Sequence, residues 1–145
     1  MYGNSSPFAS HGQRASNMYN RVGVETDVMT ASPHRLVTLL LDGAFDSMTQ
    51  AIGAIRTGNV EVKNRSLSRA VRILDEGLKA ALDLESGELA LDLRDLYAYI
   101  CMRLTYANLH SDAVAVEECV TLLQPIREAW GSIAPAAAAD QRAAA

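Results

Sequence analysis

Residues 30–59 read TASPHRLVTLLLDGAFDSMTQAIGAIRTGN, and they contain one long helix together with its start and stop signals. Ser32 suits the N-cap, because its hydroxyl accepts a hydrogen bond from an unpaired backbone N–H. Pro33 suits the first helical position, where a missing N–H costs nothing. Gly58 provides the stop and Asn59 the turn after it. Apolar residues recur between these signals in steps of three and four, which predicts one buried face: Leu36, Leu39, Leu40, Gly43, Ala44, Met48, Ala51, Ile52 and Ile55.

Three further helical segments follow this one. We expect them over about 60–83, 88–110 and 112–133, separated by Ser86-Gly87 and by Ser111. Asp112 suits the N-cap of the last segment. Pro125 lies inside that segment, so we expect a kink there. Because short connections place consecutive long helices antiparallel, the sequence predicts an all-α fold, an antiparallel up-down four-helix bundle.

The two ends of the chain differ from the middle. Residues 1–16 are rich in Ser, Gly and Asn and predict a disordered tail, and the Ala-rich residues 134–145 predict a second one. Residues 17–29 hold a short apolar segment with Tyr19, Val22 and Val24. A helix this short is marginal alone, so it must dock on the bundle. We therefore expect one helical domain over 17–133, with 17–29 as an extra N-terminal helical segment.

Composition excludes several classes of protein. The formal net charge is -4, whereas a nucleic-acid partner requires a basic surface. No apolar run approaches the roughly 20 residues that span a bilayer. The N-terminus lacks the basic and apolar regions of a signal peptide. Cys101 and Cys119 fall inside predicted helices and are expected to be reduced core residues. The cytosol is the expected location.

Residues that could perform chemistry are scattered. His11, His34 and His110 do not pair at metal-ligand spacing, and we expect His34 to face solvent. There is no phosphate-binding glycine loop, HExxH or GxSxG motif. A di-iron bundle needs inward carboxylates and a Glu-x-x-His pair, whereas Asp42 and Asp46 flank an apolar stripe and suit a polar surface. The sequence therefore predicts a protein that is not an enzyme and uses no cofactor, metal or small-molecule substrate.

The third helix is apolar on more than one side. Tyr97, Tyr99 and Tyr106 lie on it, and no charged residue occurs from Leu96 to Met102. Such a helix is either surrounded by neighbours or exposes a contact surface. The tyrosines are therefore either core and rim residues or part of a groove for a partner helix.

The chain resembles a known family, the flagellar secretion chaperone FliS. The resemblance covers about Met18 to Ile133, and its most specific part is Thr30-Ala31-Ser32-Pro33 followed by Leu41-Asp42-Gly43-Ala44, similar to the family's TASP…L…DGA signature. Further similar pieces follow in order: Ser68-Arg69-Ala70, Ile73-Leu74-Asp75-Glu76-Gly77-Leu78, Ser86-Gly87-Glu88-Leu89-Ala90, Leu96-Tyr97-Ala98-Tyr99, Ala107-Asn108-Leu109 and Glu128-Ala129-Trp130. This chain departs from the family in having Ser86 where many members have glycine and Ala98 where many have Asp.

The resemblance implies a cytoplasmic helical bundle that binds the disordered C-terminal region of flagellin. In the family, such binding prevents premature polymerisation and delivers the client to the export gate of the flagellar type III secretion apparatus. Some relatives also bind an anti-sigma factor. The resemblance implies no cofactor, no catalytic residue and no membrane insertion.

Two hypotheses about sites follow. We expect the flagellin-binding surface to use seven apolar residues of the first and third helices: Leu36, Leu39, Leu40, Leu93, Tyr97, Ile100 and Leu104. We expect the 17–29 segment to act as a lid that covers this surface when flagellin is absent, with Tyr19, Val22 and Val24 as its plugs. Thr30, Ser32 and Pro33 form the helix-start motif next to the lid. Two other classes stay open: a general helical adaptor that binds a sigma or anti-sigma factor, and a bundle enzyme or metal protein.

Overall fold

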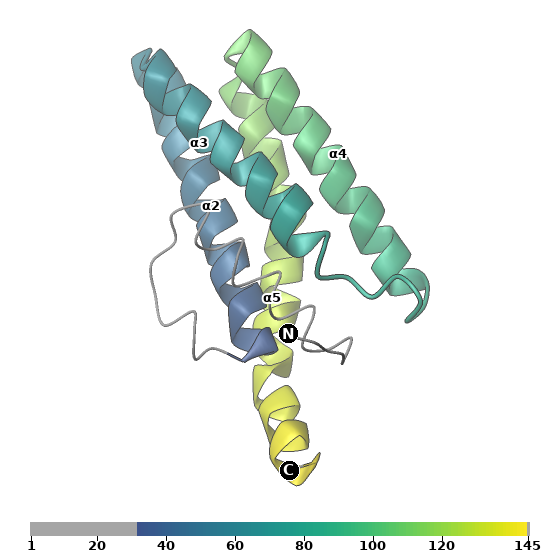
Figure 1. Ribbon diagram of the computed structural model, residues 1–145. Coiled ribbons are helices and arrows are strands. Elements are labelled where there is room, and N and C mark those ends of the chain that lie inside the picture. Colours follow the sequence, from purple (N-terminus) through teal and green to yellow (C-terminus); the bar gives the residue numbers. More distant parts are fainter. Residues whose placement is uncertain (1–31, 145) are drawn as a thin grey trace, which may run out of the picture.

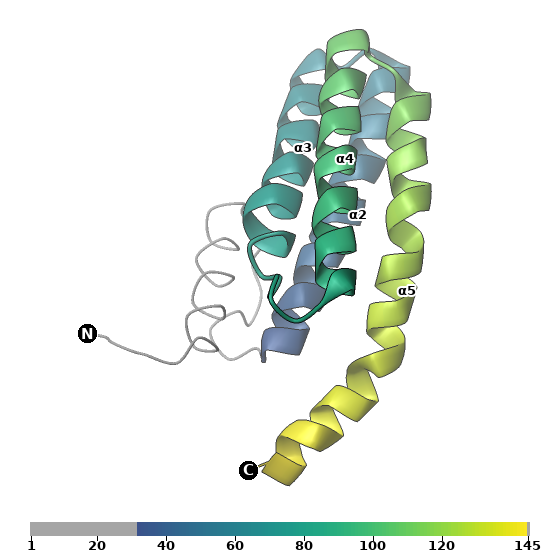
Figure 2. The same ribbon diagram turned by 90° about the vertical axis from the view of Figure 1, so that its right-hand side faces the viewer.

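Four antiparallel helices form the part of the protein that the structure describes (Figures 1 and 2). The structure, a computed structural model, describes residues 32–144, and the side chains of residues 32–133. The helices are α2 (Pro33–Thr57), α3 (Val60–Arg72), which continues into the π-helix η2 (Ile73–Leu78), α4 (Glu88–His110) and α5 (Ala113–Ala144). The described residues contain no strand. This confirms the predicted fold class, whereas the extra segment at 17–29 lies outside the described residues.

Local signals at the helix ends agree with the predictions. The Ser32 hydroxyl accepts a hydrogen bond from the Arg35 N–H at 3.1 Å, with Pro33 in the first turn. Gly58 ends α2 in the left-handed region at φ 72°, which costs glycine little. The Asp112 carboxylate accepts from the Ala115 N–H at 3.2 Å at the start of α5. These caps fix where each long helix begins and ends.

The second and fourth helices differ from their predicted bounds. After Arg72 the backbone switches to π-helical hydrogen bonds, as in Lys79 N–H to the Leu74 carbonyl at 2.8 Å, and regular helix ends at Leu78 rather than near Asp83. At the other end, α5 continues past Ile133, so most of the segment 134–145, predicted as a disordered tail, belongs to this helix. Alanine has the highest helix propensity, which explains the continuation. The helix runs on without a break across Pro125, and Figure 2 shows it curving toward its C-terminal end.

The core lies between all four helices. It contains Leu40 and Met48 of α2, Leu67 of α3, Ile100 of α4 and Leu123 of α5, each almost completely buried. Cys119 is buried in the same core and Cys101 packs against it, and both thiols are free. Burial raises the pKa of Cys101 to about 11 and that of Cys119 to about 12, so both are neutral thiols near neutral pH. They act as small apolar side chains, as predicted.

Ion pairs and hydrogen bonds join neighbouring helices outside the core. Arg56 pairs with Glu117 at 2.6 Å, and Arg127 pairs with Asp42 at 3.1 Å, both between α2 and α5. These exposed pairs contribute little stability individually, about 0–1 kcal/mol. The nearly buried Lys63 of α3 donates to the Asn108 carbonyl at 3.0 Å and thereby holds the C-terminal end of α4.

Candidate functional site: an apolar groove at one end of the bundle

An apolar groove opens at the end of the bundle where α3 and η2 give way to an irregular connection. Its volume is about 320 Å³, and its walls come from α2, η2, the connection after η2, α4 and α5. The lining residues are Val37 and Leu41 of α2, Leu78 of η2, Ala81, Leu82, Asp83 and Ser86 of the connection, Leu89, Ala90, Leu93 and Tyr97 of α4, and Ile126 and Trp130 of α5. The connection 79–87 joins η2 to α4 at this end of the bundle and forms one side of the groove (Figure 1).

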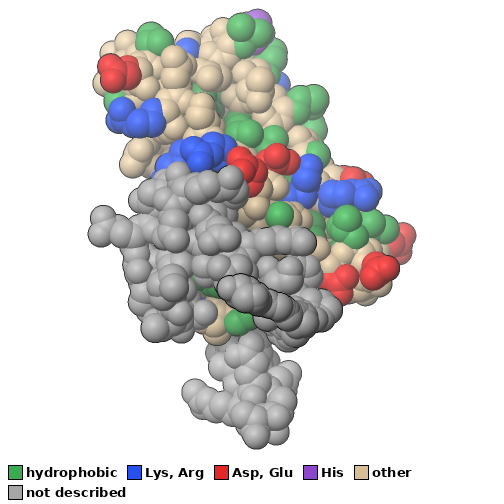
Figure 3. Space-filling view, viewed as in Figure 1, with side chains coloured by type: hydrophobic (Ala, Val, Ile, Leu, Met, Phe, Trp, Pro, Cys, Tyr) green, Lys and Arg blue, Asp and Glu red, His purple; other side chains and the backbone are tan. Residues whose placement is uncertain are grey.

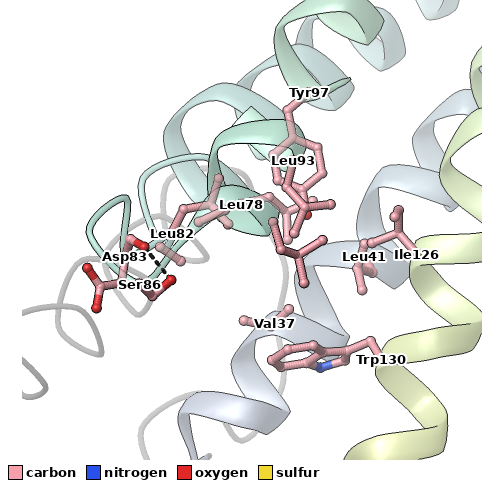
Figure 4. A pocket seen from close by; sticks show the side chains of 13 residues that line it. Val37, Leu41, Leu78, Leu82, Asp83, Ser86, Leu93, Tyr97, Ile126 and Trp130 are labelled. Atoms are coloured by element: carbon pink, nitrogen blue, oxygen red, sulfur yellow. Dashed lines mark hydrogen bonds between the residues drawn. The ribbon is translucent and has the colours of Figure 1, made fainter. Parts of the chain in front are cut away.

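The groove has an apolar interior and a polar rim. Figure 4 shows the apolar side chains facing one another across the opening, with Asp83 and Ser86 to one side. Both polar residues already have partners within the connection. The Ser86 hydroxyl donates to the Asp83 carbonyl at 2.7 Å, and an Asp83 carboxylate oxygen accepts from the Glu85 N–H at 3.1 Å. The rim therefore offers few free polar groups to orient a small molecule.

Trp130 forms the wall of the groove on α5. Its ring stacks on the His34 ring with centroids 4.5 Å apart and planes 9° apart, and its Nε1–H donates to the His34 carbonyl at 3.2 Å. With the indole N–H satisfied, the ring presents apolar surface to the groove. This contact also corrects the prediction that His34 faces solvent: the side chain is half-buried, and its Nε2 has no hydrogen-bond partner among the described residues. The stacking partner, Trp130, lies far from His34 in the sequence, so the residues around His34 could not predict this contact.

Tyr97 closes the inner end of the groove. Its side chain is buried, and this burial raises the pKa of the phenol to about 12. The phenol is therefore neutral throughout the physiological range. Leu89 stands at the opposite, outer end and is 72% exposed. The groove lining on α4 therefore ranges from the exposed Leu89 to the buried Tyr97.

The predicted flagellin-binding residues separate into two sets. Leu36, Leu39, Leu40, Ile100 and Leu104 are buried in the bundle core, so the structure corrects their assignment to an open surface. These five residues recur at the same helical spacing as the groove residues, so the sequence pattern could not separate the two sets. They differ because neighbouring helices pack closely around them. Only Leu93 and Tyr97 of the predicted set line the groove. Thr30 and the lid residues Tyr19, Val22 and Val24 lie outside the described residues.

Sequence reasoning missed most of the groove. Val37, Leu41, Leu82, Ile126 and Trp130 line it without having been expected there. A signal was available for two of them, because Ile126 and Trp130 follow Pro125 on the apolar face of the last helix. Among the described residues, no group of three or more His, Cys, Asp or Glu side chains is placed to hold a metal ion. In the same part of the chain, no helix is long and apolar enough to span a membrane.

Comparison with known proteins identifies the family of this chain. The family model described as "Flagellar protein FliS" matches residues 15–137, which includes every helix that contributes to the groove. This chain belongs to the FliS family. It is 48% identical over 120 residues to the flagellar secretion chaperone FliS of Salmonella typhimurium, covering 82% of this chain and 89% of that protein. It is 41% identical to the flagellar secretion chaperone FliS of Escherichia coli over 124 residues, or 85% and 89% of the two chains.

A third relative shows the same likeness at lower identity. The flagellar secretion chaperone FliSB of Pseudomonas aeruginosa is 36% identical over 124 residues, covering 85% of this chain and 98% of that protein. The resemblance stated from the TASP and DGA motifs is therefore confirmed. The chain is a member of a family of flagellar secretion chaperones with a helical-bundle fold.

Proposed function

We propose that this FliS-family protein is a cytoplasmic export chaperone that binds the disordered C-terminal region of flagellin in the groove between α2, α4 and α5. The observation that supports this most directly is the apolar groove itself, with its polar rim groups already paired. A groove of this kind suits apolar side chains presented by a peptide. A small-molecule site would instead need convergent free polar groups.

The size of the groove fits the energetics of a disordered client. Ordering such a segment costs conformational entropy, which buried apolar contacts must offset. Each well-buried leucine-sized side chain supplies roughly 1.5–3 kcal/mol. A groove of about 320 Å³ takes a few such side chains, so it anchors part of the segment and leaves the rest for other contacts. Shallow anchoring also lets the client leave intact when it is delivered to the secretion apparatus.

In this proposal the chaperone has no catalytic role. Bound flagellin is held apart from other flagellin molecules, which prevents premature polymerisation, and is delivered to the export gate. The lid hypothesis becomes part of the proposal: the 17–29 segment covers the groove until the client displaces it. A general helical adaptor with another client is the alternative.

Hydrogen exchange of the co-purified complex tests the proposal. We expect full-length flagellin to co-purify and to protect the backbone amides of Leu89 to Tyr97 in α4. Flagellin that lacks its C-terminal segment serves as the matched control and should neither co-purify nor protect these amides. Equal capture of both flagellins, or protection that leaves the groove unchanged, would contradict the proposed site.

A further inference from the structure

The outer face of α4 carries a stripe of large exposed side chains that the groove does not use. Tyr99, Met102, Tyr106 and Leu109 are all exposed, Met102 to 59% and Leu109 to 79%. The outer face of a bundle helix is normally polar, and contiguous exposed apolar residues mark contact surfaces. Figure 3 shows hydrophobic side chains along the upper right edge, over the C-terminal half of α4. We call these four residues the α4 stripe.

The α4 stripe continues a seven-residue repeat along the whole helix. Glu88, Asp92 and Asp95 precede its four residues in alternating steps of four and three, and all three are exposed. Apolar residues at such spacing form a face that can pack lengthwise against another helix, and the four residues of the α4 stripe supply that apolar part. At 3.6 residues per turn, these positions lie on the side of α4 opposite to the buried Tyr97, Ile100 and Leu104. A helix lying on the stripe therefore cannot also enter the groove at the same place.

The two tyrosine side chains of the stripe are held by contacts within the protein. The Tyr99 hydroxyl donates to Glu118 of α5 at 2.7 Å, and Glu118 also accepts from Arg103 Nε at 3.0 Å. The Arg103 guanidinium lies 4.7 Å from the centre of the Tyr106 ring, and that ring contacts His110 with centroids 4.3 Å apart. The hydrogen bond from Tyr99 lowers the pKa of Glu118, so the carboxylate stays charged near neutral pH. Preorganised tyrosine and arginine side chains are typical of energetically important interface residues.

The charges on this face indicate the chemistry of the partner. The repeat is acidic at its N-terminal end and apolar or aromatic at its C-terminal end. Asp92 has no ion-pair partner among the described residues, and Asp95 pairs only with the neighbouring Arg94, at 3.1 Å. A helix that covers the whole repeat gains most if it is apolar over Tyr99 to Leu109 and carries lysine or arginine over Asp92 and Asp95.

A second copy of this chain fits the face poorly. Parallel pairing of two α4 helices would place Asp92 and Asp95 opposite the same carboxylates of the partner copy. Antiparallel pairing over the full repeat would place these carboxylates over Met102 and Tyr106. The Arg103 guanidinium beside Tyr106 already pairs with Glu118, so the carboxylates would lose water without gaining a free counter-charge. Pairing restricted to four residues of each copy would bury less area than a stable dimer needs.

We propose that the α4 stripe is a second docking site, separate from the groove, for an amphipathic helix of another protein that carries basic residues at one end of its apolar face. The site is independent of the proposed flagellin groove, because the two occupy opposite sides of α4. One surface can therefore hold a client while the other engages a further protein.

Synthetic helical peptides test this proposal with the full-length protein. Each peptide is a helix with one face spaced in alternating steps of three and four residues. In the first peptide this face carries lysine in the N-terminal part and leucine in the C-terminal part, and the second peptide has the reverse order. Matched control peptides replace each lysine with glutamate. Binding is measured by fluorescence anisotropy. We expect one lysine peptide to bind saturably and more weakly at high salt, and both glutamate peptides to bind at least about tenfold more weakly.

Variants on one helix separate the two sites. Leu109→Asp should weaken binding of the lysine peptide by about tenfold or more, whereas Leu89→Asp, an equally exposed leucine of the groove, should leave it unchanged. Replacing Asp92 and Asp95 with lysine should reverse the preference in favour of the glutamate peptide. Circular dichroism checks that each variant is folded.

Several outcomes would overturn the second site. The first is that neither lysine peptide binds. The second is that binding is unchanged by Leu109→Asp and by the charge reversal. The third is that the flagellin C-terminal segment displaces the peptide. Self-association through this face, seen as a dimer by light scattering that Leu109→Asp dissociates, would assign the stripe to a second copy instead. Loss of flagellin binding on Leu89→Asp alone bears on the groove and leaves the second site standing.

Discussion

At the scale of single residues, Trp130 joins the fold to the groove. Its N–H donates to the His34 carbonyl, while its ring forms a groove wall. Trp130→Phe should lower the free energy of unfolding by about 1 kcal/mol, because the hydrogen bond to His34 is lost. It should keep most of the affinity for the flagellin segment, because an aromatic ring remains in the groove wall. Trp130→Ala should lose about 2 kcal/mol and weaken binding of the flagellin segment as well. Urea denaturation and calorimetric titration measure the two effects, and equal affinity of the Ala and wild-type proteins would remove Trp130 from the site.

Buried thiols and the buried phenol predict how stability changes with pH. Burial raises the pKa of Cys119 from 9.0 to about 12, and that of Tyr97 from 10.0 to about 12. The unfolded chain loses these protons at lower pH than the folded chain does. The stability they contribute is therefore complete below about pH 9 and is lost progressively as pH rises toward 12.

Urea denaturation between pH 8 and the alkaline limit of folding checks this prediction. The free energy of unfolding should decline from about pH 9 upward, and the decline should be shallower in Cys119→Ala, which removes one of the groups. An identical slope in the variant and the wild type would show that Cys119 does not contribute.

At the scale of elements, two exposed glycines of α2 and its cap allow a matched comparison. Neither has a neighbour that an added Cβ would meet, but Gly58 has φ 72° and Gly53 lies within regular helix. Gly58→Ala should destabilise the protein by about 1 kcal/mol, because a side chain disfavours the left-handed region. Gly53→Ala should stabilise it by about 0.5–1 kcal/mol, because alanine favours the helix interior. Thermal denaturation that shifts both variants in the same direction would contradict this account of the cap.

The helix ends could be predicted from the sequence, whereas the π-helix could not. Ser32, Gly58 and Asp112 act on backbone groups within a few residues, so their caps could be predicted from the sequence. The π-helix depends on a shift of hydrogen-bond register at Leu74 that leaves the apolar pattern almost unchanged. It could not be predicted from periodicity.

The candidate site was harder to predict for a similar reason. Leu93, Tyr97, Ile100 and Leu104 share one stripe of α4, yet only the first two line the groove. The difference lies in their neighbours: Leu93 and Tyr97 lie beside the connection 79–87 in the groove lining, whereas Ile100 and Leu104 lie in the core. These neighbours are a tertiary property, so helical spacing alone predicted the stripe and not the position of the groove.

At the scale of the whole molecule, the proposed lid predicts an effect of the N-terminal segment. An open apolar groove favours self-association, so deleting residues 1–24 should increase association of the free protein. The deletion should also raise the affinity for the flagellin segment, because no lid has to be displaced. Light scattering and calorimetric titration measure these changes. The lid hypothesis would be wrong if neither quantity changed.

The central proposal is that the groove anchors the flagellin C-terminal segment and that the α4 stripe does not. Leu89→Asp and Leu109→Asp test it as a pair, because both leucines are exposed on α4, to 72% and 79%, and only Leu89 lines the groove. Calorimetric titration of the flagellin segment should show affinity at least about tenfold lower for Leu89→Asp, since a charge replaces a leucine anchor worth roughly 1.5–3 kcal/mol. Affinity for Leu109→Asp should equal that of the wild type. Unchanged affinity for Leu89→Asp, with loss in Leu109→Asp, would contradict the account.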